Sequence, residues 1–214
     1  MRLILLTLLL TTFGAASAIA KPLRILALGT SLTQGYNLPP GTDFTAVLQA
    51  RLKKAGLDVA VVNAGVSGDT SADGLARLDW ALAEPYDAAI VEFGSNDALR
   101  GLDVAHTRSN IDAVLAKLKA KGLAVMLAGM KAPRNLGPEY IDAFDAIFPA
   151  LAKKHGILLY PFFLDGVAAD LKLNQADGIH PNEAGTQIIV TRMLPYVEKL
   201  IAQVKAKPAA AAVN

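Results

Sequence analysis

The chain of 214 residues contains no cysteine. Without a thiol, the protein cannot use a cysteine nucleophile, a thiolate metal site or a disulfide, and it cannot carry a lipid on a cysteine. It has only three histidines, and they are scattered along the chain. We therefore expect no catalytic zinc site and no other bound metal.

Several sequence patterns are also absent. The chain has no Gly-x-x-x-x-Gly-Lys-[Ser/Thr] phosphate loop and no Gly-x-Gly-x-x-Gly dinucleotide fingerprint. Position 33 is threonine, so Ser31 does not lie in the Gly-x-Ser-x-Gly elbow of the usual α/β-hydrolases. The formal net charge is only +2, and no basic block with interleaved aromatic residues occurs. Nucleic acid is therefore not an expected partner.

The longest apolar run lies at the amino terminus, where Met1-Arg2 precedes residues 3–14 and a group of small residues. A basic start, a short apolar stretch and Ala-x-Ala sites are typical of a secretory signal peptide. We assign it to residues 1–20, with cleavage after Ala18 or Ala20, although an uncleaved amphipathic or buried first helix is the alternative. The run is too short for a stable membrane anchor. We expect an exported, periplasmic monomer with one domain over residues 21–204 and a disordered tail over 205–214.

Five short apolar runs alternate with helical patterns along the rest of the chain. The strands are expected at residues 23–28, 58–63, 88–93, 123–128 and 157–160, and the helices at about 44–55, 70–82, 111–121, 141–155 and from 182. This alternation predicts an α/β fold with three layers, in which a five-stranded parallel sheet of flavodoxin-like type has helices on both faces. Pro195 is expected to kink or interrupt the last helix.

Three of the expected strands end in loops of glycine and small polar residues. The loops are Gly29-Thr30-Ser31, Gly65-Val66-Ser67-Gly68-Asp69 and Gly94-Ser95-Asn96-Asp97. The carboxyl ends of parallel strands meet at one edge, so the loops should converge there around Ser31. The glycines and the Asn96 amide could supply the N–H groups of an oxyanion hole. The alternative is that Thr30, Ser31 and Thr33 cap a helix while Asn96 and Asp97 make local turns.

A serine nucleophile needs a base, and each histidine is a candidate. His155 lies at the end of a predicted helix, where it would suit the helix dipole and need do nothing more. His106 and His180 both follow an aspartate in an Asp-x-x-His sequence, but the one at His106 directly precedes a helix and is explained by capping. Asp177-Gly178-Ile179-His180 lies in a loop beyond the fifth strand. We therefore favour His180 as the base and Asp177 as the group that orients it.

These motifs together resemble the blocks of the GDSL, or SGNH, hydrolases, in the order of that family. The corresponding segments are Gly29-Thr30-Ser31-Leu32, the glycine block around Gly68, the asparagine block around Asn96, and Asp177-Gly178-Ile179-His180-Pro181-Asn182. Three further segments look like the branch of periplasmic thioesterase I, lysophospholipases and arylesterases: Gly74-Leu75-Ala76-Arg77-Leu78, Leu99-Arg100-Gly101 and Pro161-Phe162-Phe163. The resemblance extends from Arg24 to about Gln203.

The resemblance implies roles for these residues. Ser31 would be the nucleophile, His180 the general base and then acid, and Asp177 its orienting partner. The Ser31 and Gly68 backbone N–H groups and the Asn96 side chain would hold the oxyanion. The family uses no metal or organic cofactor. Thr30 stands where the family usually has an aspartate, which places the geometry of the loop and the reaction rate in question.

The expected function is hydrolysis of acyl esters through an acyl-enzyme intermediate, with acyl thioesters, lysophospholipids or aryl esters as small-molecule substrates. The apolar side chains on the site-side loops are candidates for lining the substrate site: Leu99, Met130, Pro133, Leu136, Phe162 and Phe163. One alternative is a protein of flavodoxin-like architecture that holds a phosphate or nucleotide with the backbone around Ser31. Another is a catalytically inactive member of the same fold.

Overall fold

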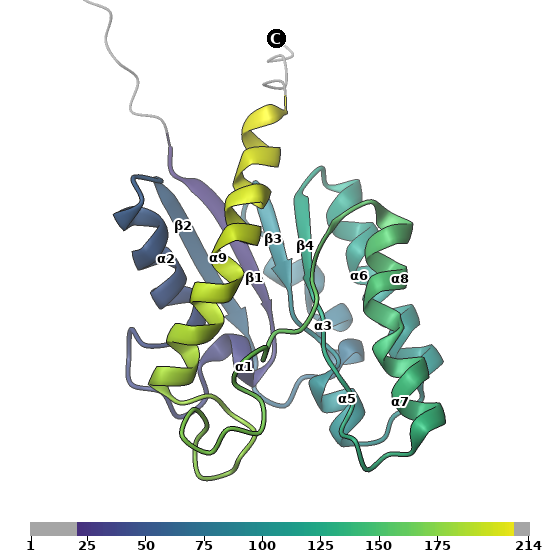
Figure 1. Ribbon diagram of the computed structural model, residues 1–214. Coiled ribbons are helices and arrows are strands. Elements are labelled where there is room, and N and C mark those ends of the chain that lie inside the picture. Colours follow the sequence, from purple (N-terminus) through teal and green to yellow (C-terminus); the bar gives the residue numbers. More distant parts are fainter. Residues whose placement is uncertain (1–20, 208–214) are drawn as a thin grey trace, which may run out of the picture.

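The computed structural model describes residues 21–207 and has the expected α/β architecture (Figure 1). Five strands form one sheet in the order β2-β1-β3-β4-β5, and each neighbouring pair is parallel. The strands are β1 (Leu23–Gly29), β2 (Val59–Gly65), β3 (Ala88–Val91), β4 (Ala124–Ala128) and β5 (Leu158–Tyr160). The predicted five-stranded parallel sheet is therefore confirmed.

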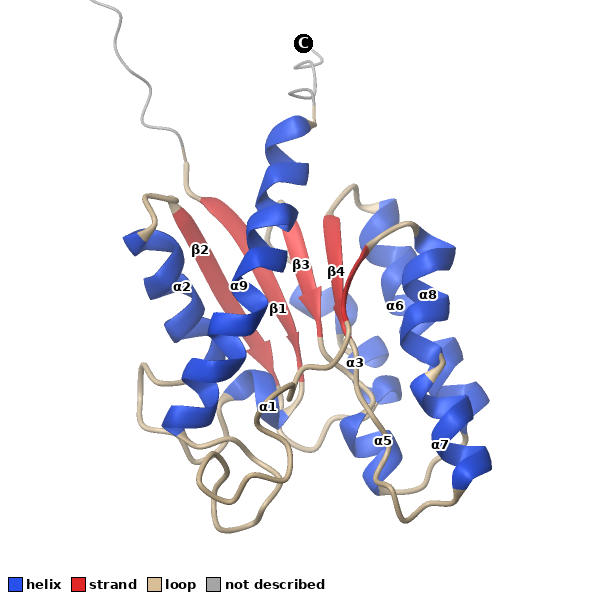
Figure 2. Cartoon of the chain, in the orientation of Figure 1, coloured by secondary structure: helices blue, strands red, loops and turns tan. Residues whose placement is uncertain are grey.

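Helices cover both faces of the sheet. On one face, α2 (Phe44–Lys54) and α9 (Glu183–Ala206) pack side by side, with α9 crossing in front of the strands in Figure 1. The other layer contains α3 (Ser71–Ala76), followed by α4 (Leu78–Ala81), together with α6 (Val104–Ala120) and α8 (Ile147–His155). The short helices α1 (Ser31–Gln34), α5 (Ser95–Leu99) and α7 (Pro138–Asp145) lie toward the carboxyl ends of the strands (Figure 2).

The core lies on both sides of the three central strands. β3 and β4 are buried along their whole length, as is most of β1, because both of their faces are covered. Phe44 and Phe163 meet edge to face on one side of the sheet, with ring centroids 5.3 Å apart. Phe144 and Phe148 form a similar pair on the other side at 5.6 Å. These packed layers hold the strand ends that carry the polar loops.

Two of the predicted helices are each divided in the structure, and the interruption expected at Pro195 does not occur. The helix expected over residues 70–82 is divided into α3 and α4 at Arg77. The helix expected over residues 141–155 is divided into α7 and α8 at Ala146. Pro149 explains the break, because its ring has no N–H and would clash with the carbonyl of residue 145 in a continuous helix. In contrast, α9 runs through Pro195 without interruption. Pro195 and Thr191 are exposed, so water can hydrate the Thr191 carbonyl that lacks its helical partner.

The predicted ends of the hydrolase domain lie close to the limits of the described residues, 21 and 207. Residues 1–20, where the signal peptide is predicted, lie outside the described residues, as do residues 208–214 of the tail. Lys205 and Ala206 were assigned to a disordered tail, but they form the last residues of α9. The apolar face of α9 extends to Val204, and its packing against the core keeps the helix regular to that point.

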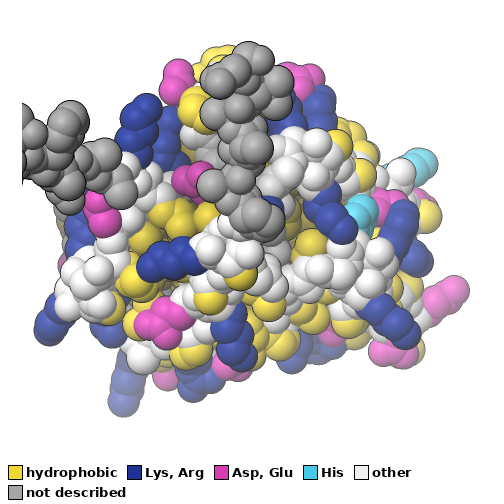
Figure 3. Space-filling view, turned by 90° about the horizontal axis from the view of Figure 1, so that it is seen from above, with side chains coloured by type: hydrophobic (Ala, Val, Ile, Leu, Met, Phe, Trp, Pro, Cys, Tyr) yellow, Lys and Arg dark blue, Asp and Glu magenta, His cyan; other side chains and the backbone are white. Residues whose placement is uncertain are grey.

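The face at the amino ends of the strands is turned away from the polar loops. Figure 3 shows it from above, with lysines and arginines spread around the rim and acidic side chains between them. Among residues 21–207, no helix is long and apolar enough to cross a membrane. The polar loops gather at the opposite edge, the lower one in Figure 2.

Candidate active site

Ser31 lies immediately beyond the end of β1, as the first residue of α1. Gly29 permits the sharp turn: a Cβ there would lie 2.2 Å from Thr33 Oγ1 and 2.6 Å from Glu92 Oε2. The Thr30 side chain accepts a hydrogen bond from the Leu32 N–H, so helix capping is the correct interpretation for Thr30. The Ser31 hydroxyl is instead directed to another part of the chain.

That partner is His180, whose Nε2 lies 2.8 Å from Ser31 Oγ. The other ring nitrogen, Nδ1, lies 2.7 Å from Asp177 Oδ2. The Tyr36 ring packs against the imidazole, with centroids 4.7 Å apart. A hydroxyl, an imidazole and a carboxylate in this order can pass a proton from the serine to the ring while the carboxylate holds the ring in place.

The loop that carries His180 is held by its own backbone. Asp177 Oδ1 accepts hydrogen bonds from the N–H groups of Ile179 at 2.9 Å and His180 at 3.0 Å. Burial opposes ionisation of Asp177, but the hydrogen bonds from His180 and Ile179 outweigh it and lower the pKa of this carboxyl to about 2. Asp177 therefore carries its negative charge beside the imidazole at neutral pH.

The two other histidines lie elsewhere. The Asp103 side chain accepts from the His106 N–H at the start of α6, and the His106 side chain is 87% exposed. His155 Nε2 lies 2.6 Å from Asp112 Oδ1, near the carboxyl end of α8. The structure therefore brings His180 to Ser31 and leaves His106 in the capping role that its sequence context indicated.

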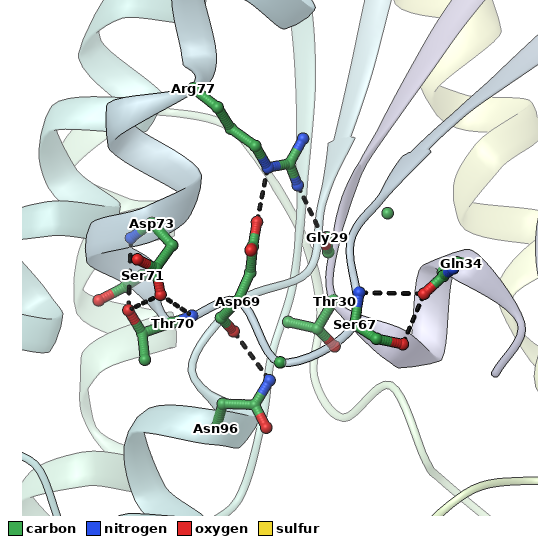
Figure 4. Close-up of polar contacts among 12 residues, drawn as sticks. Gly29, Thr30, Gln34, Ser67, Asp69, Thr70, Ser71, Asp73, Arg77 and Asn96 are labelled. Carbon is green, nitrogen blue, oxygen red and sulfur yellow. Dashed lines mark hydrogen bonds and ion pairs between the residues drawn. The ribbon is translucent and has the colours of Figure 1, made fainter.

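Gly68 and Asn96 border the same cavity as Ser31 and His180. Gly68 has a φ of +86°, a conformation that favours glycine. Asn96 Nδ2 donates to the Asp69 carbonyl at 2.8 Å, which fixes the orientation of the amide (Figure 4). The carboxylate of Asp97 accepts from the Ser71 N–H at 2.9 Å. The local-turn interpretation is therefore wrong for both side chains, because each bonds to a distant segment.

Glu92 is the buried carboxylate beneath the Ser31 turn, and its role was not predicted from the sequence. It directly follows β3 and is 1% exposed. Its Oε2 accepts from the Thr30 N–H at 3.0 Å and from Thr33 Oγ1 at 2.9 Å, and Thr30 Oγ1 lies 3.0 Å from the same oxygen. The signal that could have identified it is an acidic residue at the end of a buried apolar strand.

The Glu92 contacts explain how the turn tolerates threonine at position 30. Thr30 offers the carboxylate a hydroxyl and an N–H donor, whereas an aspartate there would place a second carboxyl against the first. The turn keeps Ser31 Oγ within hydrogen-bond distance of His180. The question that Thr30 raised about loop geometry is answered by these contacts, while the reaction rate is a matter for experiment.

Burial raises the pKa of Glu92 from 4.5 to about 7, although the hydrogen bonds from Thr30 and Thr33 partly offset this effect. Between pH 4.5 and about pH 7, the folded protein retains a proton on Glu92 that the unfolded chain has lost. The free energy of unfolding therefore falls as the pH rises through this range. The pKa shift of Glu92 corresponds to a fall of about 3 kcal/mol. Glu92→Gln should therefore become more stable relative to the original protein between pH 5 and pH 8.

Thermal unfolding of both proteins at several pH values would measure this change. The glutamine can accept from the threonines with its oxygen and donate to Thr30 Oγ1 with its amide, as a protonated carboxyl does. A difference in Tm that stays constant from pH 5 to pH 8 would contradict the raised pKa.

An open cavity of about 590 Å³ extends from Ser31 and His180. Of the side chains predicted to line it, Leu99, Met130, Pro133 and Phe162 do so. The expectation was wrong for Phe163, which is fully buried against Phe44. It was also wrong for Leu136, which packs against the core. Phe162 therefore faces the cavity, whereas its neighbour Phe163 is packed into the core.

Other residues that line the cavity were missed by the sequence analysis. They include Leu32, Tyr36, Ala132, Leu164, Ala168 and Ile179. Ile179 lies inside the Asp-x-x-His segment, and Tyr36 directly follows the turn at Gly35, so their positions beside the motifs were the available signals. Within the described residues, no group of three or more histidines and carboxylates could hold a metal ion.

The chain is similar in sequence to known hydrolases. A family model described as "GDSL-like Lipase/Acylhydrolase family" matches residues 27–188. Esterase TesA of Pseudomonas aeruginosa is 41% identical over 178 residues, which cover 83% of this chain and 89% of the relative. Thioesterase 1/protease 1/lysophospholipase L1 of Escherichia coli K12 is 36% identical over 195 residues, covering 91% of this chain and 90% of the relative.

Two further proteins similar to this chain are also named as esterases. An arylesterase of Vibrio mimicus is 34% identical over 181 residues, covering 84% of this chain and 86% of the relative. The crystal structure of AlinE4, an SGNH-hydrolase family esterase, has a TM-score of 0.72 and 40% identity, and the match covers 90% of this chain and all of that one. These relatives are named as hydrolases, so they do not favour the phosphate-binding alternative.

Proposed function

The chain belongs to the GDSL-like lipase/acylhydrolase family and hydrolyses acyl esters, and from this premise we propose that it does so with Ser31, His180 and Asp177 through an acyl-enzyme intermediate. The observation that carries the proposal is the continuous series of contacts from Ser31 Oγ to His180 at 2.8 Å and from His180 to Asp177 at 2.7 Å. This order of groups activates a serine hydroxyl without any metal.

In the first half of the reaction, Ser31 Oγ attacks the carbonyl carbon of the ester while His180 Nε2 takes the hydroxyl proton. The carbonyl oxygen becomes an oxyanion, which accepts hydrogen bonds from the Ser31 and Gly68 N–H groups and from Asn96 Nδ2. The bond to the leaving group then breaks, and His180 gives its proton to the departing alcohol or thiol. Asp177 stabilises the imidazolium throughout this step.

In the second half, a water molecule replaces the leaving group. His180 takes a proton from the water, whose oxygen attacks the acyl carbon bonded to Ser31 Oγ. The same three donors hold the second oxyanion, and its collapse releases the carboxylic acid as the proton returns to Ser31. The enzyme is then in its starting state.

The cavity beside the serine is the proposed acyl site. Its walls carry Met130, Pro133 and Phe162, and Leu99 lies at its mouth with 51% of its surface exposed. An apolar acyl or aryl group would be removed from water there. Following the names of the relatives, we propose acyl thioesters, lysophospholipids and aryl esters as the substrate classes.

The cellular location is proposed from the amino-terminal sequence. Residues 1–20 carry the signal-peptide pattern, with cleavage after Ala18 or Ala20, and export would place the hydrolase domain of residues 21–206 in the periplasm. We propose that the exported enzyme is a monomer that needs no cofactor.

A fluorophosphonate probe tests the nucleophile directly. Its phosphorus is attacked by an activated serine, which gives a stable covalent adduct, so one adduct per chain is expected on the peptide that contains Ser31. Intact-mass and peptide mass spectrometry would locate it. Ser67 and Ser95 also border the cavity and serve as internal controls that should remain unlabelled. A folded protein without an adduct, or with one on either control serine, would contradict the proposed nucleophile.

A further inference from the structure

A partly buried ion pair lies beneath the Gly68 loop, outside the contacts of the proposed mechanism. Arg77, the residue between α3 and α4, donates from Nε to Asp69 Oδ2 at 2.5 Å. Its Nη2 donates to the Gly29 carbonyl at 3.0 Å (Figure 4). The two side chains are only 17% and 12% exposed. One guanidinium therefore joins the loop after β2 to the last residue of β1.

The Gly68 loop is also joined to the segment that follows β3. The Asp69 carbonyl accepts the hydrogen bond from Asn96 Nδ2. The contacts thus run from Gly29 to Arg77, from Arg77 to Asp69 and from Asp69 to Asn96. Gly29 lies two residues before Ser31, and Asp69 directly follows Gly68. The series links the three strand ends that carry the three proposed oxyanion donors.

Close packing brings Arg77 to this position. Gly74, in the turn of α3 before Arg77, faces the Phe93 ring, and a Cβ on Gly74 would lie 2.1 Å from Phe93 Cζ. A larger residue would push α3 away from the end of β3. The absence of a side chain at Gly74 therefore allows the guanidinium to reach the Gly29 carbonyl.

The burial of Arg77 is not explained by stability alone. Its Nη1 is buried and has no hydrogen-bond partner, which costs free energy. Partly buried ion pairs can often be replaced by apolar side chains without loss of stability. An aliphatic side chain could fill the same space, but it could not bond to two segments at fixed angles as the planar guanidinium does.

We propose that Arg77 and Asp69 are positioning residues that set the spacing of the Ser31, Gly68 and Asn96 donors in the oxyanion hole. Neither side chain borders the cavity, so neither touches the substrate. The inference rests on the proposed esterase mechanism. Donors stabilise an oxyanion only when they lie about 2.7–3.1 Å from it. A displacement of about 1 Å can lower the rate by about 10²-fold.

The first test is the steady-state kinetics of Arg77→Met and Arg77→Lys. We expect Arg77→Met to lower kcat by about 10- to 100-fold with KM changed by less than about threefold, because the displaced donors act on the transition state. Arg77→Lys keeps the charge but can satisfy only one of the two acceptors, so its kcat should fall between those of Arg77→Met and the original protein. Arg77→Lys also preserves the test if the methionine variant does not fold.

The control is Arg24→Met. Arg24 pairs with Glu84 at 3.5 Å near the amino end of β1, the end of the sheet opposite to the polar loops. Its loss should leave kcat within about twofold of the original value, because exposed pairs contribute little. A comparable loss of kcat in this control would show that any broken arginine pair has the effect, which would overturn the proposal.

A double-mutant cycle with Asn96→Ala separates positioning from general structure. Asn96→Ala alone should lower kcat by about 10²–10³-fold. If Arg77 acts partly by placing Asn96, an Arg77 substitution should cost clearly less in the Asn96→Ala background than in the original protein. Equal fold losses in both backgrounds, or a lower Tm with unchanged kcat, would overturn the proposal.

The same measurements distinguish a failure of the proposed esterase mechanism from a failure of the positioning role alone. The original protein would then neither hydrolyse esters nor react with the fluorophosphonate probe, and both proposals would be overturned together. An active, labelled original protein with additive variants would overturn only the positioning role.

Discussion

Replacing Ser31 with alanine is expected to lower kcat by about 10⁶-fold while the protein stays folded. The hydroxyl is the group that bonds to the acyl carbon, and no neighbouring side chain can take over this step at the same position. The backbone N–H of residue 31 remains available to the oxyanion. The measurement is hydrolysis of a chromogenic aryl ester, with thermal unfolding to show that Tm is unchanged within a few degrees.

Ser95→Ala is the matched control for this substitution. Ser95 borders the same cavity, and its hydroxyl lies 3.4 Å from Thr30 Oγ1 but makes no contact with His180. It should retain activity within about tenfold, since it changes a neighbour of the turn and no reacting group. Substantial esterase activity in a folded Ser31→Ala protein would remove Ser31 from the mechanism.

The second large effect is expected at His180. His180→Ala removes the group that takes the serine proton, and kcat should fall by a factor similar to that of Ser31→Ala, about 10⁶-fold. His106→Ala is the control because His106 lies in the same Asp-x-x-His pattern. Its side chain is exposed on α6 and its ring has no part in the site, so kcat should change by less than about twofold.

Parallel kinetics on the two variants would decide between the histidines. A large loss for His106→Ala together with an active His180→Ala would reverse the assignment of the base. The rate of fluorophosphonate labelling provides a second measurement, because an unactivated serine reacts slowly. His180→Ala should therefore also lose labelling of Ser31, whereas His106→Ala should label at the original rate.

The layers of the fold were predictable from local patterns. The buried strands read as short apolar runs, and the alternation with amphipathic helices implied a parallel sheet. Parallel strands place their carboxyl ends at one edge, so the convergence of the loops around Ser31, Gly68 and Asn96 followed from topology. The helix break at Ala146 was missed because the pattern of apolar residues continues across it, although Pro149 was visible in the sequence.

Other features depended on contacts between distant segments. The choice of His180 over His106 rested on loop context in the sequence, but only the structure brings one of them to Ser31, from 149 residues away. Glu92 carried no prediction from the sequence, yet its side chain bonds to Thr30 and Thr33 from the end of the neighbouring strand. Phe162 and Phe163 have the same side chain, and only packing assigns one to the cavity and the other to the core.

The sequence by itself therefore determined the α/β class, the family, and the residues Ser31, Gly68, Asn96, Asp177 and His180 as candidates for one site. Local periodicity and short motifs carry this information, because burial and turn geometry act over a few residues. The tertiary structure alone decided which histidine meets the serine, and that Arg77, Asp69 and Glu92 support the strand ends. Those contacts join segments separated by many residues, and their distances depend on how the layers pack.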